Sequence, residues 1–200
     1  MTAPDLVHGA WGRQSVSIDN GPRFETQLVV WLQAGTRYAD LRIPFHPAAE
    51  EGCFTGWSGW DGERYRWTRH LDLMGSELPS PDDVGDLTSE NGVLVERGTF
   101  STPSGPLPYE EVWVRLPGAD GLWQVFESPT ACLVRVGDHA ITVVDGRPDG
   151  GSFAACYRIR GANGWMLQQS IGDAADLPAP GEPTPGWRTV HSGDAMVVTA

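Results

Sequence analysis

The sequence predicts an all-β fold with little helix, in which about 10 to 12 strands form an antiparallel β-barrel. Turn dipeptides such as Asn91-Gly92 and Asp145-Gly146 recur along the chain at intervals of roughly 8 to 14 residues. The segments between them are rich in Val, Ile, Thr, Trp, Tyr and Phe, and none keeps a helical apolar period for three turns. Many short antiparallel strands need a sandwich or a closed barrel, because an open sheet leaves unpaired edges. Hairpins that follow one another without long crossovers favour the barrel.

The turns delimit the expected strands in chain order. They are 10–18, 23–33, 36–43, 63–73, 92–100, 109–116, 121–127, 130–136, 152–160, 164–171, 186–191 and 194–199. One helical turn is expected at 47–51. The Pro-rich, acidic segments 76–89 and 172–186 are expected to be surface loops, and the residues after them to return and close the barrel. The whole chain, 1–200, is expected to form one domain, because too few residues follow the last loop for another.

Composition excludes several classes of function. The formal charge of −12 argues against nucleic acid and anionic membrane surfaces as partners, since both attract positive patches. The chain contains no Lys, which excludes Schiff-base chemistry. Its apolar runs are far shorter than the ~20 residues that span a bilayer. No secretory signal pattern opens the sequence, and Cys53, Cys132 and Cys156 form no CxxC motif, so we expect reduced thiols and a cytoplasmic protein.

Period-two alternation divides the expected strands into faces. In 36–43, one face carries Tyr38, Asp40 and Arg42, and the other carries Ala39, Leu41 and Ile43. In 63–73, one face carries Arg66, Thr68, His70 and Asp72, and the other carries Trp67, Arg69, Leu71 and Leu73. In 109–116, one face carries Tyr109, Glu111, Trp113 and Arg115. Such faces either point into water or line a pocket, and the mixture of aromatic rings with charges is typical of a pocket wall.

Trp57, Trp60 and Trp67 crowd into a short segment with Gly52, Gly56 and Gly59. The glycines suggest a tight, irregular segment at a barrel mouth, where functional loops gather. The tryptophans offer rigid contact area for a ligand or, equally, fill the barrel.

These faces supply the candidate site residues. The candidate acid–base groups are Glu111, His70 and Asp40. The candidate ligand-binding residues are Arg42, Trp67, Glu96, Trp113 and Arg115, of which the two arginines suit a carboxylate or an enolate. An inward-facing Glu111 has to meet an arginine, donate a proton or bond a ligand, because a lone buried carboxylate is unstable.

No cofactor or metal is expected. The histidines lack HxH or HxxxH spacing, and the chain has no GxSxG, GxGxxG or GxxxxGK[ST] motif. Two minor alternatives remain open. One is a metal held by His46, His70 and a carboxylate, and the other is a haem bound by His70 or His191.

Four segments resemble the lipocalin-like (calycin) β-barrel proteins. They are 31–44 (WLQAGTRYADLRIP), 71–98, 109–118 (YEEVWVRLPG) and 133–147 (LVRVGDHAITVVDGR), and their order is similar to that of the Hri-type family, which has a fungal member that interacts with casein kinase. The lipocalin GxW signature is loosely echoed by Gly9-Ala10-Trp11. The resemblance implies a calycin-type barrel. It implies no reaction, because the family brings no catalytic residues to carry over.

Two functions follow from these observations. In the first, the barrel holds a small apolar or aromatic molecule in its cup and carries out cofactor-independent acid–base chemistry of the lyase, isomerase or cyclase kind. In the second, the barrel is filled, and the acidic Pro-rich loops 76–89 and 172–186 contact a protein partner. An open cup with charged walls favours the first, and a dry aliphatic interior favours the second. The sequence leaves open whether the protein is an enzyme.

Overall fold

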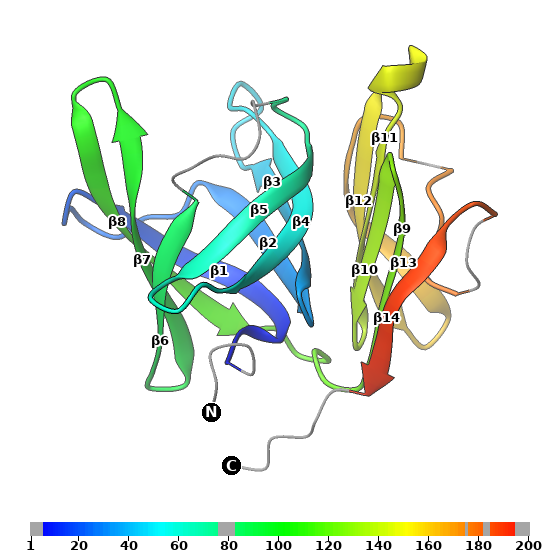
Figure 1. Ribbon diagram of the computed structural model, residues 1–200, viewed down its shortest axis with the longest axis horizontal. Coiled ribbons are helices and arrows are strands. Elements are labelled where there is room, and N and C mark those ends of the chain that lie inside the picture. Colours follow the sequence, from blue (N-terminus) through cyan, green and yellow to red (C-terminus); the bar gives the residue numbers. More distant parts are fainter. Residues whose placement is uncertain (1–5, 76–82, 175, 182–184, 195–200) are drawn as a thin grey trace.

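The structure is a computed structural model that describes residues 6–75, 83–174, 176–181 and 185–194. Within these ranges the chain is almost entirely β, which confirms the predicted fold class. The helical content is limited to a turn at Leu6–Val7 and the 3₁₀ turn η1 (Arg147–Asp149), and 47–51 forms a turn but no helix. Two layers are visible in Figure 1, a closed barrel and a sheet that packs beside it.

The barrel is an up-and-down meander in which each strand pairs with the next and the first pairs with the last. Its strands are β1 (Gly9–Ile18), β2 (Gln27–Ala34), β3 (Arg37–Pro44), β4 (Gly52–Trp60), β5 (Tyr65–Asp72), β6 (Val84–Glu90), β7 (Val93–Thr102) and β8 (Gly105–Arg115). Asn91 and Gly92 both have positive φ, which is the conformation of the tight turn that joins β6 to β7. Closure leaves the barrel without an exposed edge.

The second layer is a six-stranded antiparallel sheet in the order β13-β12-β11-β10-β9-β14. Its strands are β9 (Leu122–Ser128), β10 (Ala131–Val136), β11 (His139–Asp145), β12 (Phe153–Gly161), β13 (Gly164–Ile171) and β14 (Arg188–Asp194). The sequence suggested that the residues at the end of the chain close the barrel. That prediction is wrong for the described residues. Those of β14 pair with β9 in this sheet, whereas residues 195–199 lie outside the described residues.

The main apolar core lies between the two layers. It combines the outward face of β1–β5, including Leu32, Ala39 and Leu41, with the inner face of the sheet, including Val134 and Ile141. Polar links surround it. Arg37 of β3 bonds Glu127 of β9 at 3.0 Å, and Arg147 donates to the backbone oxygens of Asp72 and Leu73.

A second apolar cluster fills one end of the barrel interior. It consists of Val7, Trp11, Val29, Trp31, Tyr38, Tyr65, Trp67, Leu94 and Trp113. Val7 is fully buried, and its carbonyl accepts a hydrogen bond from the Trp11 indole at 2.7 Å. The turn that contains Val7 thus closes this end.

The expected faces hold in β3 and β8 but not in β5. Tyr38, Asp40 and Arg42 point into the barrel, and Leu41 points into the interlayer core. In β5, Thr55 pairs with Leu71 and Gly56 with Arg69, so His70 is an extra residue. This β-bulge exchanges the two faces beyond Arg69.

Several segments differ from the sequence prediction. The glycine-rich 52–60 is the regular strand β4 rather than an irregular loop. Gly56 is required because a Cβ there would lie 1.9 Å from the Thr68 carbonyl oxygen, so the glycine marks a close strand contact. Part of the expected loop 76–89 is β6, although 76–82 lies outside the described residues. The segment 139–145, which is not among the expected strands, is the buried strand β11.

Candidate functional site

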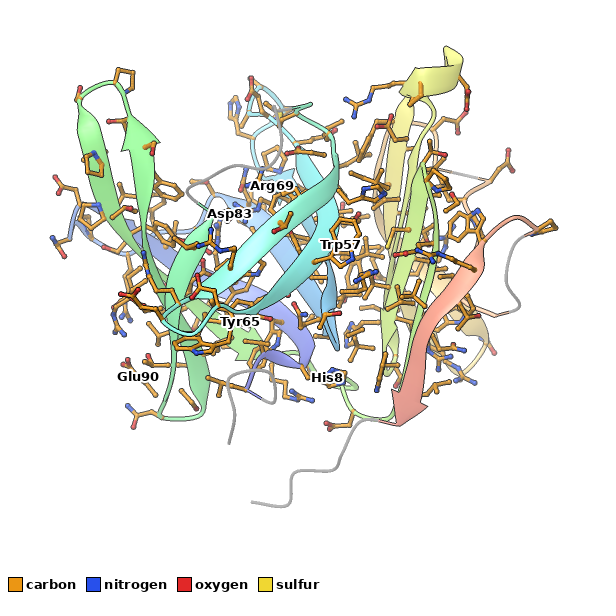
Figure 2. The ribbon with its side chains drawn as sticks, in the orientation of Figure 1. His8, Trp57, Tyr65, Arg69, Asp83 and Glu90 are labelled. Atoms are coloured by element: carbon orange, nitrogen blue, oxygen red, sulfur yellow. The ribbon has the colours of Figure 1, made fainter. Side chains whose placement is uncertain are left out.

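A pocket opens inside the barrel, above the aromatic cluster. It contains about 80 Å³ of space for water-sized molecules. Its walls come from β2–β5, β7, β8 and the residue before β6. The lining residues are Trp31, Tyr38, Asp40, Arg42, Phe54, Trp67, Arg69, Asp83, Glu96, Phe100, Tyr109, Glu111 and Trp113. In Figure 2, Arg69 and Asp83 lie toward one end of the barrel and Tyr65 toward the other.

Two buried carboxyl groups face each other across neighbouring strands. Glu96 of β7 pairs directly with Glu111 of β8, so both side chains point into the pocket. The Tyr109 hydroxyl donates to Glu96 at 2.7 Å, and Arg13 donates to Glu111 at 2.5 Å. Burial, reinforced by the charge of Glu111, raises the pKa of Glu96 to about 8. Glu96 therefore holds its proton near neutral pH.

Arg13 of β1 joins Glu111 to Glu25. It donates to Glu25 at 2.8 Å, and its side chain is only 6% exposed. Burial alone would lower the pKa of Arg13, but its carboxylate partners outweigh burial and raise it. The backbone N–H groups of Thr26 and Gln27 also donate to Glu25. Burial raises the pKa of Glu25, but the bonds from Arg13 and from these backbone N–H groups outweigh burial and lower it.

The opposite wall carries two further arginine–carboxylate groups. Arg42 bonds Asp40 within β3 at 2.8 Å. Arg69 bonds both Asp72, at 2.9 Å, and Asp83, at 3.0 Å. Burial raises the pKa of Asp83, while Arg69 opposes that shift. Both guanidinium groups also lie over the Phe54 ring, at 5.0 and 4.1 Å from its centroid.

The floor of the pocket is a chain of edge-to-face aromatic rings. Trp31 contacts Trp67 and Trp113, with ring centroids 5.9 and 5.4 Å apart. Phe100 stacks on Tyr109 at 4.4 Å and is 39% exposed, which places it at the mouth. The Tyr38 hydroxyl and the Trp113 indole N–H are buried and make no hydrogen bond to the described residues. Such unpaired polar atoms are rare in protein interiors and call for an explanation.

The structure brings six of the eight candidate site residues together in this pocket. They are Asp40, Arg42, Trp67, Glu96, Glu111 and Trp113. His70 lies outside, exposed on the outer wall and 5.0 Å from the Trp57 ring, because alternation places it on the face opposite Trp67 and Arg69, which point into the pocket. Arg115 lies at the closed end, over Trp11 and bonded to Asp120. It shares a face with Glu111 but lies four positions further along β8.

Four residues of the site were not among the candidates that the sequence supplied. They are Arg13 and Glu25, which are linked to Glu111, and Arg69 and Asp83 on the opposite wall. Alternation from Trp11 would have put Arg13 on the inner face, and alternation from Trp67 did put Arg69 there. Nothing local distinguishes Glu25 or Asp83, which lie outside regular strands. Arg13 proves to be the partner of Glu111, in place of the expected Arg42 or Arg115.

The histidines and cysteines are the other groups that could carry a functional site. In the described part of the chain, no group of His, Cys, Asp and Glu is arranged to hold a metal ion. His46 and His70 are both exposed, and His191 lies in β14 of the second sheet. Cys53, Cys132 and Cys156 are free and buried. No helix among the described residues is long and apolar enough to cross a membrane.

Fold and pocket together define an eight-stranded antiparallel closed barrel, compatible with a lipocalin-like fold, whose interior is aromatic at one end and ionised at the other. Comparison with family models, curated proteins and solved structures finds no match to this chain.

Proposed function

We propose that this protein binds a small molecule in the barrel pocket, in a cytoplasmic setting. The observation that carries the proposal is the pocket itself, in which aromatic rings and buried ionisable groups surround a space that no side chain of the described residues fills. One water molecule needs roughly 10–15 Å³ of such space. The pocket of about 80 Å³ therefore has room for several waters or for a compact ligand. A larger ligand can extend past Phe100 at the mouth.

The ligand in this proposal combines an apolar or aromatic body with a polar group. Trp31, Trp67 and Trp113 provide the surface for the body. The polar group meets the carboxylates and arginines around it. An amphipathic ligand is thereby oriented, with its ring toward aromatic surface and its polar group toward charge.

Acid–base chemistry on the bound molecule is the finer part of the proposal. Glu96 retains its proton near neutral pH and can donate it, while Glu111, bonded to Arg13, offers carboxylate oxygens on the neighbouring strand. An acid and a base on the same wall suit a cofactor-independent isomerisation, elimination or cyclisation. The acid–base proposal depends on the positions of Glu96 and Glu111 and on the proton of Glu96. The binding proposal depends only on the pocket.

The alternative function is a non-catalytic interaction module that contacts a partner through its Pro-rich loops. A dry aliphatic interior would favour it. The barrel interior instead holds charged side chains, and the aliphatic core lies outside the barrel, between the layers. This distribution favours the ligand pocket.

Glu111→Gln separates the two functions, because it keeps the shape and removes the charge. If the pocket binds a ligand, the variant should keep a β-rich circular dichroism spectrum and show weaker quenching of tryptophan fluorescence by benzyl alcohol or benzylamine. If the interior is only structural, no compound of this size should change the fluorescence of the wild type, and the variant should chiefly lower Tm by removing one of the two carboxylate partners of Arg13. Glu110→Gln is the matched control, since Glu110 is the next residue and faces Arg23 and Arg97 on the outer wall.

A further inference from the structure

The charges around the pocket do not balance. Among the described residues, the lining carries four carboxyl groups (Asp40, Asp83, Glu96 and Glu111) and two guanidinium groups (Arg42 and Arg69). Arg13 adds a third cation beside Glu111, but it also binds Glu25, and Arg69 also binds Asp72, so the formal balance of six carboxyl and three guanidinium groups is −3. Buried negative charge of this kind is costly unless it is protonated or compensated.

Glu96 is the carboxyl group that lacks a cation. It is only 8% exposed and lines the pocket. The Tyr109 hydroxyl is its hydrogen-bond donor, and no arginine of the described chain forms an ion pair with it. A cation that enters the pocket would supply the missing charge.

The aromatic floor is also available to a cation. The arginines that stack on rings in the described structure lie over Trp11, Phe54, Trp57, Phe153 and Trp165. None lies over Trp31, Trp67 or Trp113, whose indole faces attract positive charge most strongly among aromatic side chains. The unpaired Tyr38 hydroxyl on the same wall offers an oxygen to an N–H donor.

A bare metal ion fits this arrangement poorly. Each of Asp40, Asp83 and Glu111 is already bonded to an arginine, and the described carboxylates are not grouped for coordination. An organic cation spreads its charge over several atoms and needs no shell of coordinating oxygens. It is held by the surrounding field and by ring faces.

We propose that the ligand of this pocket is a small organic cation, an amine whose protonated nitrogen lies near Glu96 while its apolar body lies against the tryptophans. This inference rests on the proposed function and names its ligand class. The ammonium group converts Glu96 into an ion pair, and the proton of Glu96 passes to the solvent.

Three compounds with the same ring and different charge test the inference: benzylamine, benzyl alcohol and phenylacetate. Isothermal titration calorimetry with the full-length protein at pH 7 should give benzylamine at least about tenfold tighter binding than benzyl alcohol, with phenylacetate weakest. Added salt should reduce the difference in affinity between benzylamine and benzyl alcohol less than it would for a site of exposed charges, because the pocket is buried. If the alcohol or the acid binds as tightly as the amine, the inference is wrong and the ligand pocket stands. If no compound binds, both are wrong.

Proton release supplies an independent readout. Titration of benzylamine in two buffers with different ionisation enthalpies should show a fraction of a proton released per amine bound at pH 7. The charged or titratable groups that face Glu96 are Glu111 and Tyr109 of β8, Asp40 and Arg42 of β3, and Asp83 before β6. Of these, Asp83 is the other group with a raised carboxyl pKa, so Asp83→Asn must be compared with Glu96→Gln.

Glu96→Gln should abolish the proton release and weaken benzylamine severalfold, while benzyl alcohol binds as before. Glu110→Gln, on the outer wall, should leave the affinities for benzylamine and benzyl alcohol and the proton release unchanged. Retention of proton release in Glu96→Gln together with its loss in Asp83→Asn would overturn the assignment to Glu96.

Discussion

The interlayer core and the barrel interior are built from the same strands but have opposite chemistry. The interlayer core is mostly aliphatic, with Ala, Val, Leu, Ile and Cys as its main side chains. The barrel interior has tryptophans and tyrosines at one end and ion pairs at the other. β3 shows the contrast residue by residue, because Leu41 faces the sheet while Asp40 and Arg42 face the pocket.

The comparison shows that the aliphatic core and the charged pocket lie on opposite faces of the same barrel strands. In a barrel that stands alone, the inward face is the core and the outward face is wet. Here the second sheet covers the outer face of β2–β4, so burial outside the barrel can stabilise the fold. The interior is then free to hold charged groups, which a sole core of this size would not tolerate.

The largest effect should come from the buried arginine of the interior. Arg13→Met leaves Glu25 and Glu111 without their shared cation, and removal of one partner from a buried ion pair costs about 3–5 kcal/mol. Urea denaturation should show this loss in the free energy of unfolding. Arg97→Met is the control, because Arg97 also bridges two carboxylates but is 42% exposed, and its loss should cost less than about 1 kcal/mol. Equal losses would mean that Arg13 is not buried as described.

Leu41→Ala should have the next largest effect. Leu41 is fully buried between the layers, and such truncations cost about 2–5 kcal/mol. Denaturation should remain a single transition by circular dichroism and by tryptophan fluorescence, because barrel and sheet share this core. Two separate transitions would show that the layers unfold independently and would contradict the expectation of one domain for residues 1–200.

Glu96→Gln should change the pH dependence of stability. The pKa of Glu96 rises from 4.5 to about 8 on folding, so the native state binds more protons than the unfolded state between these values. Stability of the wild type should therefore fall as pH rises through this window, by up to about 1.4 kcal/mol per pH unit from this group. The difference between wild type and variant in urea denaturation at pH 5, 6, 7 and 8 isolates that slope. A difference that is constant with pH would show that Glu96 is ionised throughout.

The smallest effect is expected for Arg115→Ala. Arg115 is exposed at the closed end and pairs with Asp120, so its removal should cost less than about 1 kcal/mol. Benzylamine affinity should stay within twofold of the wild type. A larger loss of affinity would place the binding site at the closed end instead.

Local signals predicted the faces of the site well where the strands are regular. Alternation grouped Asp40 with Arg42 and Glu111 with Trp113, and the structure keeps both groupings. It failed in β5 beyond Arg69, because a single inserted residue reverses the pattern there, so Leu71 faces the interlayer core although alternation grouped it with Trp67 and Arg69. The inserted residue leaves no clear mark in the sequence. Gly56 led to a different wrong prediction, an irregular loop, because glycine is required both in such loops and where two strands come into close contact.

The sequence by itself determined that the protein is all β, where its tight turns fall, and which residues share a face, because propensity, turn chemistry and period-two alternation act over a few residues. Only the tertiary structure decided which face is covered and by what. The closure of β1 on β8, the assignment of β14 to the second sheet and the pairing of Arg13 with Glu111 join residues far apart in the chain. Such contacts depend on the summed packing of the whole molecule, so a polar face that could equally point into water becomes the wall of a pocket.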